Sequence, residues 1–233
     1  MANLLPARLD ELLLLGAHCD DIAIGAGGTV LELCKAYPQM RVTALVLTGG
    51  GGERELEERA ALGAFCSGIQ PKVDVLDLPD GRLPDRWGEV KRQLQALRER
   101  TEPDLILAPA RHDAHQDHRL LGELVPTAFR RHLTLGYEIL KWESDLAQPA
   151  VLLPVAEPML RRKVELLFEH YPSQHGRDWF DPEAFTGLAR VRGVQCHERY
   201  AEGFHLDKLV VGVSGARSLA AAVSAEGVEC VYS

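Results

Sequence analysis

The chain has 233 residues, 46% of them hydrophobic and 26% charged, which is the composition of a globular protein long enough for one α/β domain with a sizeable core. Its 34 acidic residues outnumber its 26 basic residues, and a formal net charge of -8 opposes attraction to phosphates, so we expect no nucleic-acid partner. The first apolar run is too short to span a membrane and follows no signal peptide, so we expect a cytoplasmic protein without a transmembrane segment.

Short apolar runs alternate with amphipathic segments in the first part of the chain. The runs have the character of strands buried on both faces and lie at residues 12–17, 42–47, 73–78 and 105–109. The amphipathic segments have helical spacing and lie at 27–37, 53–65, 87–100 and 118–131. Such alternation builds βαβ units, so the sequence predicts a three-layer α/β/α sandwich around a Rossmann-like, mostly parallel sheet.

The second part of the chain predicts fewer and less regular elements. We expect strands at 137–142 and 208–213, an apolar run at 151–155, and helices at 157–170 and 182–191. No linker rich in Pro, Gly or Ser separates a second domain, so a single domain is expected over residues 1–213. Residues 214–233 show no clear period and form a tail without an assignment.

Polar side chains directly follow the first predicted strand, in the segment Ala-His-Cys-Asp-Asp at 17–21. In open parallel sheets, ligands bind at the carboxyl ends of the strands, so His18, Asp20 and Asp21 point to a site there. Three ionisable groups so close to a buried strand cost free energy unless something compensates them. A bound cation is one such compensation.

A second polar cluster follows the fourth predicted strand and includes His115, Asp117 and His118. Strands one and four flank the switch point of a doubly wound sheet, so we expect the two clusters to meet. Histidine and carboxylate ligands suit Zn²⁺, and two histidines with one carboxylate leave a coordination position open for water. The pattern therefore favours a catalytic metal over a structural one.

These two clusters resemble the motifs of the PIG-L or LmbE-like family of zinc-dependent deacetylases, which are AHPDD after strand one and HxDH after strand four. This chain has AHCDD at 17–21 and HQDH at 115–118, so that only Cys19 departs from the pattern. Arg54 with Glu57, and the segments 173–174, 192–193 and 200–204, add to the resemblance, which extends over about residues 12–213.

The resemblance implies a metal-dependent hydrolase that removes an N-acyl group, with acetyl expected, from an amino sugar such as an N-acetylglucosamine unit of a glycan precursor, glycolipid or glycoside. It implies a metal site, a general base, a paired imidazole that stabilises or protonates the reacting amide, and a residue that contacts the small-molecule substrate. These roles fall on His18, Asp21 and His118 for Zn²⁺ or another divalent cation, on Asp20 for the base, on His115 paired with Asp117 for the imidazole, and on Arg54 for the substrate.

The sequence leaves several alternative functions and interpretations open. A zinc amidase acting on a non-sugar N-acyl amine or thiol conjugate would have the same metal site, and a Rossmann-like fold alone also permits a sugar-nucleotide-binding module without hydrolytic activity. The segment 48–54 is equally well interpreted as a simple flexible turn. The glycines at 25–28 lack the G-x-G-x-x-G spacing, so close helix packing is the preferred interpretation. A homo-oligomer is neither predicted nor excluded.

Two residue types call for a choice between packing and function. The five cysteines include no CxxC pair, and we interpret Cys19 as a packed thiol rather than a zinc ligand. The tryptophans are interpreted first as core side chains, although Trp142, near a predicted strand end, could serve as a sugar-stacking platform.

Overall fold

The sheet forms around strand β1 (Glu11–Gly16), a run of leucines in which every residue is buried. The computed structural model describes residue 5 and residues 8–210 of the chain. Its seven strands follow the order β3-β2-β1-β4-β5-β7-β6. The first five along this order are parallel, and β7 runs antiparallel to both of its neighbours. The remaining strands are β2 (Arg41–Thr48), β3 (Lys72–Leu78), β4 (Leu105–Pro109), β5 (Leu133–Tyr137), β6 (Val151–Pro154) and β7 (Ala201–His205).

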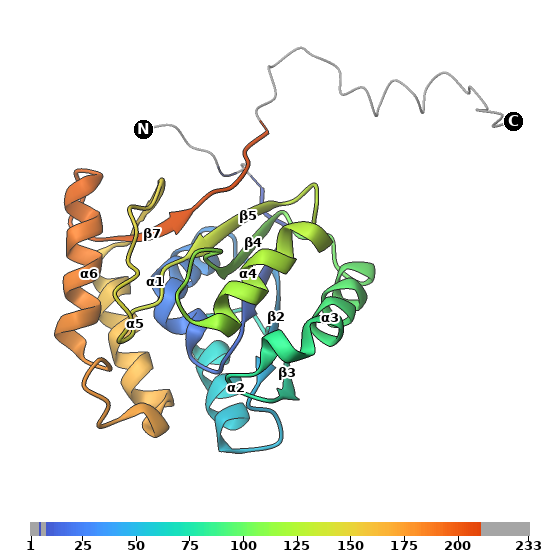
Figure 1. Ribbon diagram of the computed structural model, residues 1–233. Coiled ribbons are helices and arrows are strands. Elements are labelled where there is room, and N and C mark those ends of the chain that lie inside the picture. The colour runs from blue at the N-terminus through green and yellow to red at the C-terminus, as the bar shows by residue number, and fades with distance from the viewer. Residues whose placement is uncertain (1–4, 6–7, 211–233) are drawn as a thin grey trace, which may run out of the picture.

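Helices cover both faces of this sheet (Figure 1). Because side chains alternate along a strand, Leu12 and Leu14 pack on one face while Leu13 and Leu15 pack on the other. The first face carries α1 (Asp21–Ala36), α2 (Glu53–Phe65), α5 (Glu157–His170) and α6 (Pro182–Gln195), and the second carries α3 (Trp87–Glu99) and α4 (Gln116–Ala128). Short 3₁₀ turns occur at Leu83–Arg86 and Pro172–Gln174. The predicted three-layer, mostly parallel architecture is confirmed.

Several predicted boundaries were wrong. The strand expected at 137–142 is β5, which ends at Tyr137, because Leu135 and Tyr137 are the buried residues that pair with β4. Helix α1 begins at Asp21, well before residue 27, since its first turns are buried on all sides and show no amphipathic period. Of the strand expected at 208–213, residues 208–210 have no regular structure, and the rest, like the tail 214–233, lies outside the described residues.

Strand β7 escaped prediction because a charged residue interrupts its apolar pattern. Glu202 is buried, and its carboxylate accepts hydrogen bonds from the backbone N–H groups of Gly28 (2.9 Å) and Thr29 (2.7 Å) and from the ammonium of Lys163 (2.6 Å). These partners compensate the buried charge and tie β7 to α1 and α5. Tertiary contacts thus stabilise a strand that local sequence does not indicate.

Helix α1 lies unusually close to the sheet. A Cβ atom at Gly25 would lie 2.3 Å from a ring carbon of Tyr137, whose hydroxyl donates to the backbone carbonyl of Leu15 at 2.6 Å. This contact supports the packing interpretation of the glycines at 25–28. It also fixes the start of α1 close to the carboxyl end of β1, where the first polar cluster lies.

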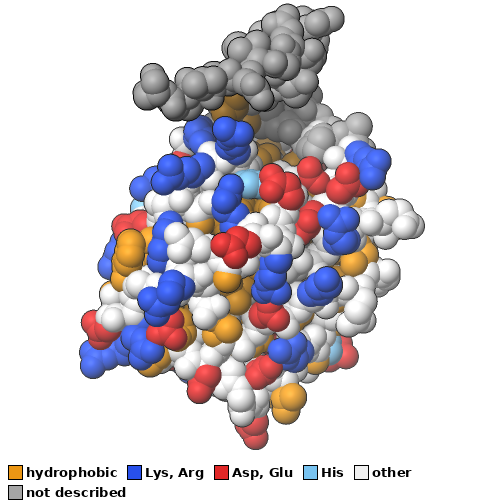
Figure 2. Space-filling view, turned by 90° about the vertical axis from the view of Figure 1, so that its right-hand side faces the viewer, with side chains coloured by type: hydrophobic (Ala, Val, Ile, Leu, Met, Phe, Trp, Pro, Cys, Tyr) orange, Lys and Arg blue, Asp and Glu red, His pale blue; other side chains and the backbone are white. Residues whose placement is uncertain are grey.

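Within residues 8–210, none of the helices has both the length and the apolar character needed to cross a bilayer. Figure 2 shows the face to the right of Figure 1, where basic and acidic side chains are interspersed and hydrophobic side chains form only small groups.

Candidate active site

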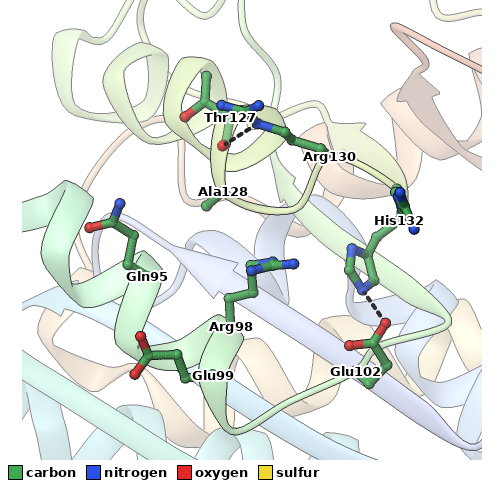
Figure 3. A pocket seen from close by; sticks show the side chains of 9 residues that line it. Gln95, Arg98, Glu99, Glu102, Thr127, Ala128, Arg130 and His132 are labelled. Carbon is green, nitrogen blue, oxygen red and sulfur yellow. Dashed lines mark hydrogen bonds and ion pairs between the residues drawn. The ribbon is translucent and has the colours of Figure 1, made fainter. Parts of the chain in front are cut away.

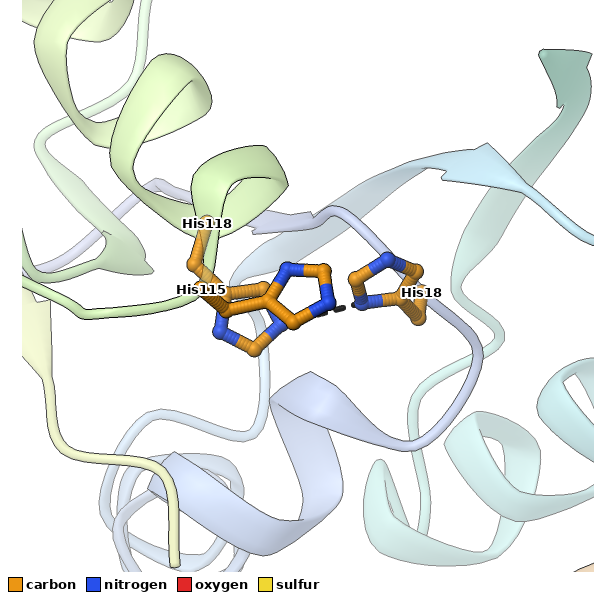
Figure 4. A group of neighbouring side chains, drawn as sticks. All are labelled: His18, His115 and His118. Atoms are coloured by element: carbon orange, nitrogen blue, oxygen red, sulfur yellow. Dashed lines mark hydrogen bonds between the residues drawn. The ribbon is translucent and has the colours of Figure 1, made fainter. Parts of the chain in front are cut away.

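The two polar clusters meet at the carboxyl ends of the adjacent strands β1 and β4. His18 extends from the loop after β1, and His115 and His118 come from the start of α4 (Figure 4). The ring centroids of His18 and His118 are 4.9 Å apart, and those of His115 and His118 are 4.6 Å apart. The expectation that the clusters share one site is correct.

His18, Asp21 and His118 direct their ligating atoms at one point. His18 Nδ1 lies 2.9 Å from His118 Nε2, and Asp21 places Oδ1 3.1 Å from His118 Nε2 and Oδ2 3.6 Å from His18 Nδ1. Ligand atoms bonded at about 2.0–2.1 Å to a tetrahedral ion lie roughly 3.4 Å from one another. The 2.9 and 3.1 Å separations are close to that value, although the two Asp21 contacts use different oxygen atoms. The described groups whose single ligand atoms lie close enough to share one ion are His18, His115 and His118, and His18, Asp80 and Asp117. His18 and His118 therefore lie at the centre of a candidate metal site, with Asp21 beside them.

Carboxylates also hold the outer nitrogen of each of these two imidazoles. His18 Nε2 lies 3.2 Å from Asp117 Oδ2, and His118 Nδ1 lies 3.2 Å from Asp113 Oδ2. Such outer carboxylates orient ligating histidines in metal sites and increase their basicity. Asp113 belongs to the second polar cluster, but its role was missed because sequence spacing does not show which ring nitrogen faces which carboxylate.

The predicted pairing of His115 with the Asp117 carboxylate is wrong. The Asp117 carboxylate faces His18 and accepts hydrogen bonds from the backbone N–H groups of Gly81 (2.7 Å) and Leu83 (3.0 Å). His115 instead caps α4, and its Nδ1 accepts the backbone N–H of Asp117 at 3.3 Å. A ring nitrogen that accepts carries no proton, so the neutral His115 ring has its proton on Nε2.

The charges of the site favour a cation at the shared point. Burial disfavours protonated His118, but Asp21 and Asp113 outweigh it and raise its pKa to about 9. Burial likewise opposes the ionised form of Asp21, yet His118 and His18 hold the pKa of Asp21 well below its usual range. Each imidazole charge is thus stabilised by carboxylates, and a divalent cation would benefit from the same negative surroundings.

Asp20 is placed beside the ligand set without belonging to it. Its backbone has φ of 112°, in the left-handed region that few residues other than glycine adopt. Its carboxylate receives a hydrogen bond from Arg54 at 2.9 Å. Burial raises the pKa of Asp20 to about 6, although Arg54 opposes the shift. A carboxylate with a pKa near neutrality suits proton transfer.

Two residues of α2 hold Asp20 in this conformation. Arg54 also donates to the carbonyl of Cys19 and, at 2.5 Å, to the hydroxyl of Ser173. Glu58 is completely buried, and its Oε2 accepts the backbone N–H of Asp20 (2.9 Å) and the hydroxyl of Tyr171 (2.7 Å). Burial raises the pKa of Glu58 to about 8. Glu58 was missed because an acidic residue on a polar helix resembles an ordinary surface charge.

Cys19 takes no part in the ligand set. Its side chain is buried, its thiol donates to the carbonyl of Thr48 at 3.5 Å, and burial raises its pKa. A thiol that stays protonated and faces β2 is a packing group. The interpretation of Cys19 as a packed thiol is therefore supported.

A cavity of about 520 Å³ opens above the cluster. Its floor includes His18, Asp21 and His118, and Arg54 and His115 lie in its wall. Further wall residues come from the loop after β5 and the segment after α5: Ile139, Leu140, Lys141, Trp142, Glu143, Ser173, Gln174, Arg177 and Trp179. The expectation that Trp142 is a core side chain is wrong, because the residue is 64% exposed.

A second hollow of about 840 Å³ lies between the C-terminal ends of α3 and α4 (Figure 3). Arg98 and Arg130 reach into it, and His132 lies 3.3 Å from Glu102. Among the described residues, the groups able to hold a metal ion include none of these side chains. The metal-binding geometry therefore belongs to the first cavity.

Comparison with known proteins identifies the family. Residues 13–129, half of the chain, match the family model described as PIG-L, GlcNAc-PI de-N-acetylase. The chain therefore belongs to the PIG-L family, and the resemblance drawn from its motifs is confirmed. A diacetylchitobiose deacetylase of Thermococcus kodakarensis is 32% identical over 130 residues, which cover 49% of this chain and 47% of the relative. The match thus spans about half the length of that curated relative.

Solved structures share the fold over most of the chain. The N,N'-diacetylchitobiose deacetylase of Pyrococcus horikoshii superposes with a TM-score of 0.66 at 21% identity, covering 85% of this chain and 84% of that one. A teicoplanin deacetylase in a zinc-inhibited form superposes with a TM-score of 0.64 at 18% sequence identity. The superposition covers 82% of this chain and 96% of that one. The 4-carboxy-2-hydroxymuconate hydratase of Pseudomonas putida superposes with a TM-score of 0.70 at 18% sequence identity. The superposition covers 89% of this chain and 100% of that one. One fold thus supports different reactions, and the activity has to be argued from the site.

Proposed function

We propose that this protein is a metal-dependent N-deacetylase that hydrolyses the acetamido group of an amino sugar. The observation that carries the proposal is the convergence of His18, Asp21 and His118 on one point, with the Asp20 carboxylate beside it at the floor of a cavity. Family membership and the deacetylase relatives support the same reaction class.

In this proposal His18, Asp21 and His118 hold one divalent cation, with Zn²⁺ as the first candidate. A bound ion of this kind supplies Lewis acidity, which acidifies water and polarises the acyl carbonyl. Asp20 accepts the proton that water loses as its oxygen bonds to the acyl carbon. Arg54 and Glu58 hold Asp20 in the position where that transfer occurs.

His115 serves as the donor to the reacting amide. Burial, together with the charges of His118 and His18, lowers the pKa of His115, and its proton lies on Nε2 because Nδ1 accepts a backbone N–H. A neutral N–H donor stabilises the negative charge that develops on the acyl oxygen. When the C–N bond breaks, Asp20 passes the proton that it took from water to the leaving nitrogen, so the products are the free amine and acetate.

The test is mass spectrometry of products from the purified, zinc-loaded protein. The substrates are N-acetylglucosamine, N,N'-diacetylchitobiose and an N-acetylated thiol conjugate. We expect loss of one acetyl group from at least one sugar, and loss of activity on chelation that returns with added metal. Hydrolysis of the thiol conjugate alone would refute the sugar assignment, and full activity without metal would refute the mechanism.

A further inference from the structure

Trp142 stands in the wall of the active-site cavity and is 64% exposed. Exposed tryptophan is unfavourable in water, since the side chain is among the largest apolar surfaces that a protein can bury. Trp142 nevertheless remains open to the cavity, in the loop between β5 and β6. An exposed aromatic ring beside a catalytic cluster is available to a ligand.

The ring is fixed in place before any ligand arrives. Its indole N–H donates to Asp178 Oδ1 at 2.6 Å, and the ring of Trp179 meets it edge-on, with 6.1 Å between centroids. The guanidinium of Arg177 lies over the ring, 5.9 Å from its centroid. A side chain held in this way loses little conformational entropy on binding, so more of the contact energy goes into affinity.

The surroundings of the ring match an amphipathic ligand. Arg177 offers N–H donors, and Glu143, next to Trp142 in the chain, offers a carboxylate; both line the same cavity. Within residues 8–210 the Glu143 side chain has no hydrogen-bond partner, so it is available as an acceptor. A pyranose ring has an apolar C–H face that stacks on indole and a rim of hydroxyl groups that pair with such donors and acceptors. An acyl chain stacked on the ring would cover these polar groups and displace their water without offering hydrogen bonds in return.

We infer that Trp142, with Arg177 and Glu143, forms a binding site for a second sugar ring, joined to the sugar whose acetamido group is hydrolysed. The inference rests on the proposed function for the position of the first sugar. It assigns a disaccharide or longer oligosaccharide, rather than a free monosaccharide, as the substrate class. A cavity of about 520 Å³ is within the range of roughly 300–1,000 Å³ typical of small-molecule sites.

The first experiment compares the KM values of N-acetylglucosamine and N,N'-diacetylchitobiose for the wild type, Trp142→Ala and Trp142→Tyr. We expect Trp142→Ala to raise KM for the disaccharide about tenfold, which corresponds to about 1.4 kcal/mol, with kcat and the monosaccharide KM within about twofold of wild type. Trp142→Tyr should restore most of the disaccharide affinity. Trp87→Ala is the matched control, because Trp87 is 53% exposed but lies at the start of α3, outside the cavity.

A binding measurement separates this inference from the proposed function. Calorimetric titration of N,N'-diacetylchitobiose into the zinc-loaded Asp20→Asn protein, with and without Trp142→Ala, reports the sugar contact without hydrolysis. Tryptophan-dependent binding without turnover in the wild type would contradict the deacetylase proposal and keep the sugar site. Equal effects of Trp142→Ala on both substrates, or no effect on either, would overturn the second-sugar site even if deacetylation occurs.

Discussion

Replacing Glu58 with a neutral residue should stabilise the protein at high pH, because the folded state keeps this buried acid protonated. Glu58 is fully buried, and its pKa of about 8 lies above the ordinary value of 4.5. The folded state therefore holds a proton that the unfolded state releases between pH 4.5 and about 8. Stability that depends on this proton falls as the pH rises through that window and is fully lost above it.

The magnitude follows from the two pKa values. At 1.36 kcal/mol per pKa unit, the wild type should lose about 4 kcal/mol relative to Glu58→Gln between pH 5 and pH 9. The amide oxygen of Gln keeps an acceptor for the Asp20 N–H and the Tyr171 hydroxyl. Glu58→Ala removes that acceptor and leaves the two buried donors without a hydrogen-bond partner. This should lower the free energy of unfolding by about 1–3 kcal/mol for each donor, independently of pH in this range.

Urea unfolding at several pH values between 5 and 9 measures these differences. Glu123→Gln, on the exposed side of α4, serves as the control and should follow the wild type. At neutral pH we expect Glu58→Gln to retain near wild-type turnover, since Asp20 keeps its backbone anchor, and any folded Glu58→Ala protein to lose about a hundredfold in kcat. If the stability difference between wild type and Glu58→Gln does not change with pH, Glu58 is ionised in the folded protein and its pKa is not raised.

Three further predictions follow from the metal cluster. Asp113→Asn should weaken zinc affinity by about 10–100-fold, because it removes the carboxylate that contacts the outer nitrogen of His118. Competition with a chelating dye measures this affinity, and an unchanged value would mean that the contact does not orient His118. Cys19→Pro, which restores the family's usual residue, should keep one zinc per chain, and loss of zinc from a folded variant would assign Cys19 to the ligand set. His115→Ala should retain zinc while lowering kcat by about 10²–10³-fold, whereas loss of metal would make His115 a ligand.

The parts of the fold that sequence predicted well are those governed by local pattern. The strands β1, β2 and β4 are mostly apolar and buried, and α2 and α3 have amphipathic faces, so period and composition were sufficient. Strand β3 was also predicted, but it contains Asp74 and Asp77 and is only partly buried rather than buried on both faces. The failures share one cause, which is stabilisation by distant residues. Strand β7 depends on Lys163 and on α1 to compensate Glu202, and β5 is defined by its pairing with β4.

For the candidate site, the sequence predicted which residues lie together but not how their side chains are oriented. Motif spacing correctly predicted that His18, Asp21 and His118 would lie together, because the ends of neighbouring parallel strands meet. Spacing carries no information on the direction of a side chain. The family resemblance implied a pairing of Asp117 with His115, whereas the carboxylate faces His18. Spacing also gave no signal for Glu58, which is completely buried beside Asp20.

We propose different roles for the two adjacent aspartates: Asp21 binds the metal, and Asp20 accepts the proton. The most direct measurement is the zinc content of Asp20→Asn and Asp21→Ala, determined alongside their rates of acetate release from N,N'-diacetylchitobiose. We expect Asp20→Asn to retain about one zinc per chain while turnover falls by about two to four powers of ten, and Asp21→Ala to lose the metal. Loss of zinc from Asp20→Asn with retention in Asp21→Ala would contradict the assignment.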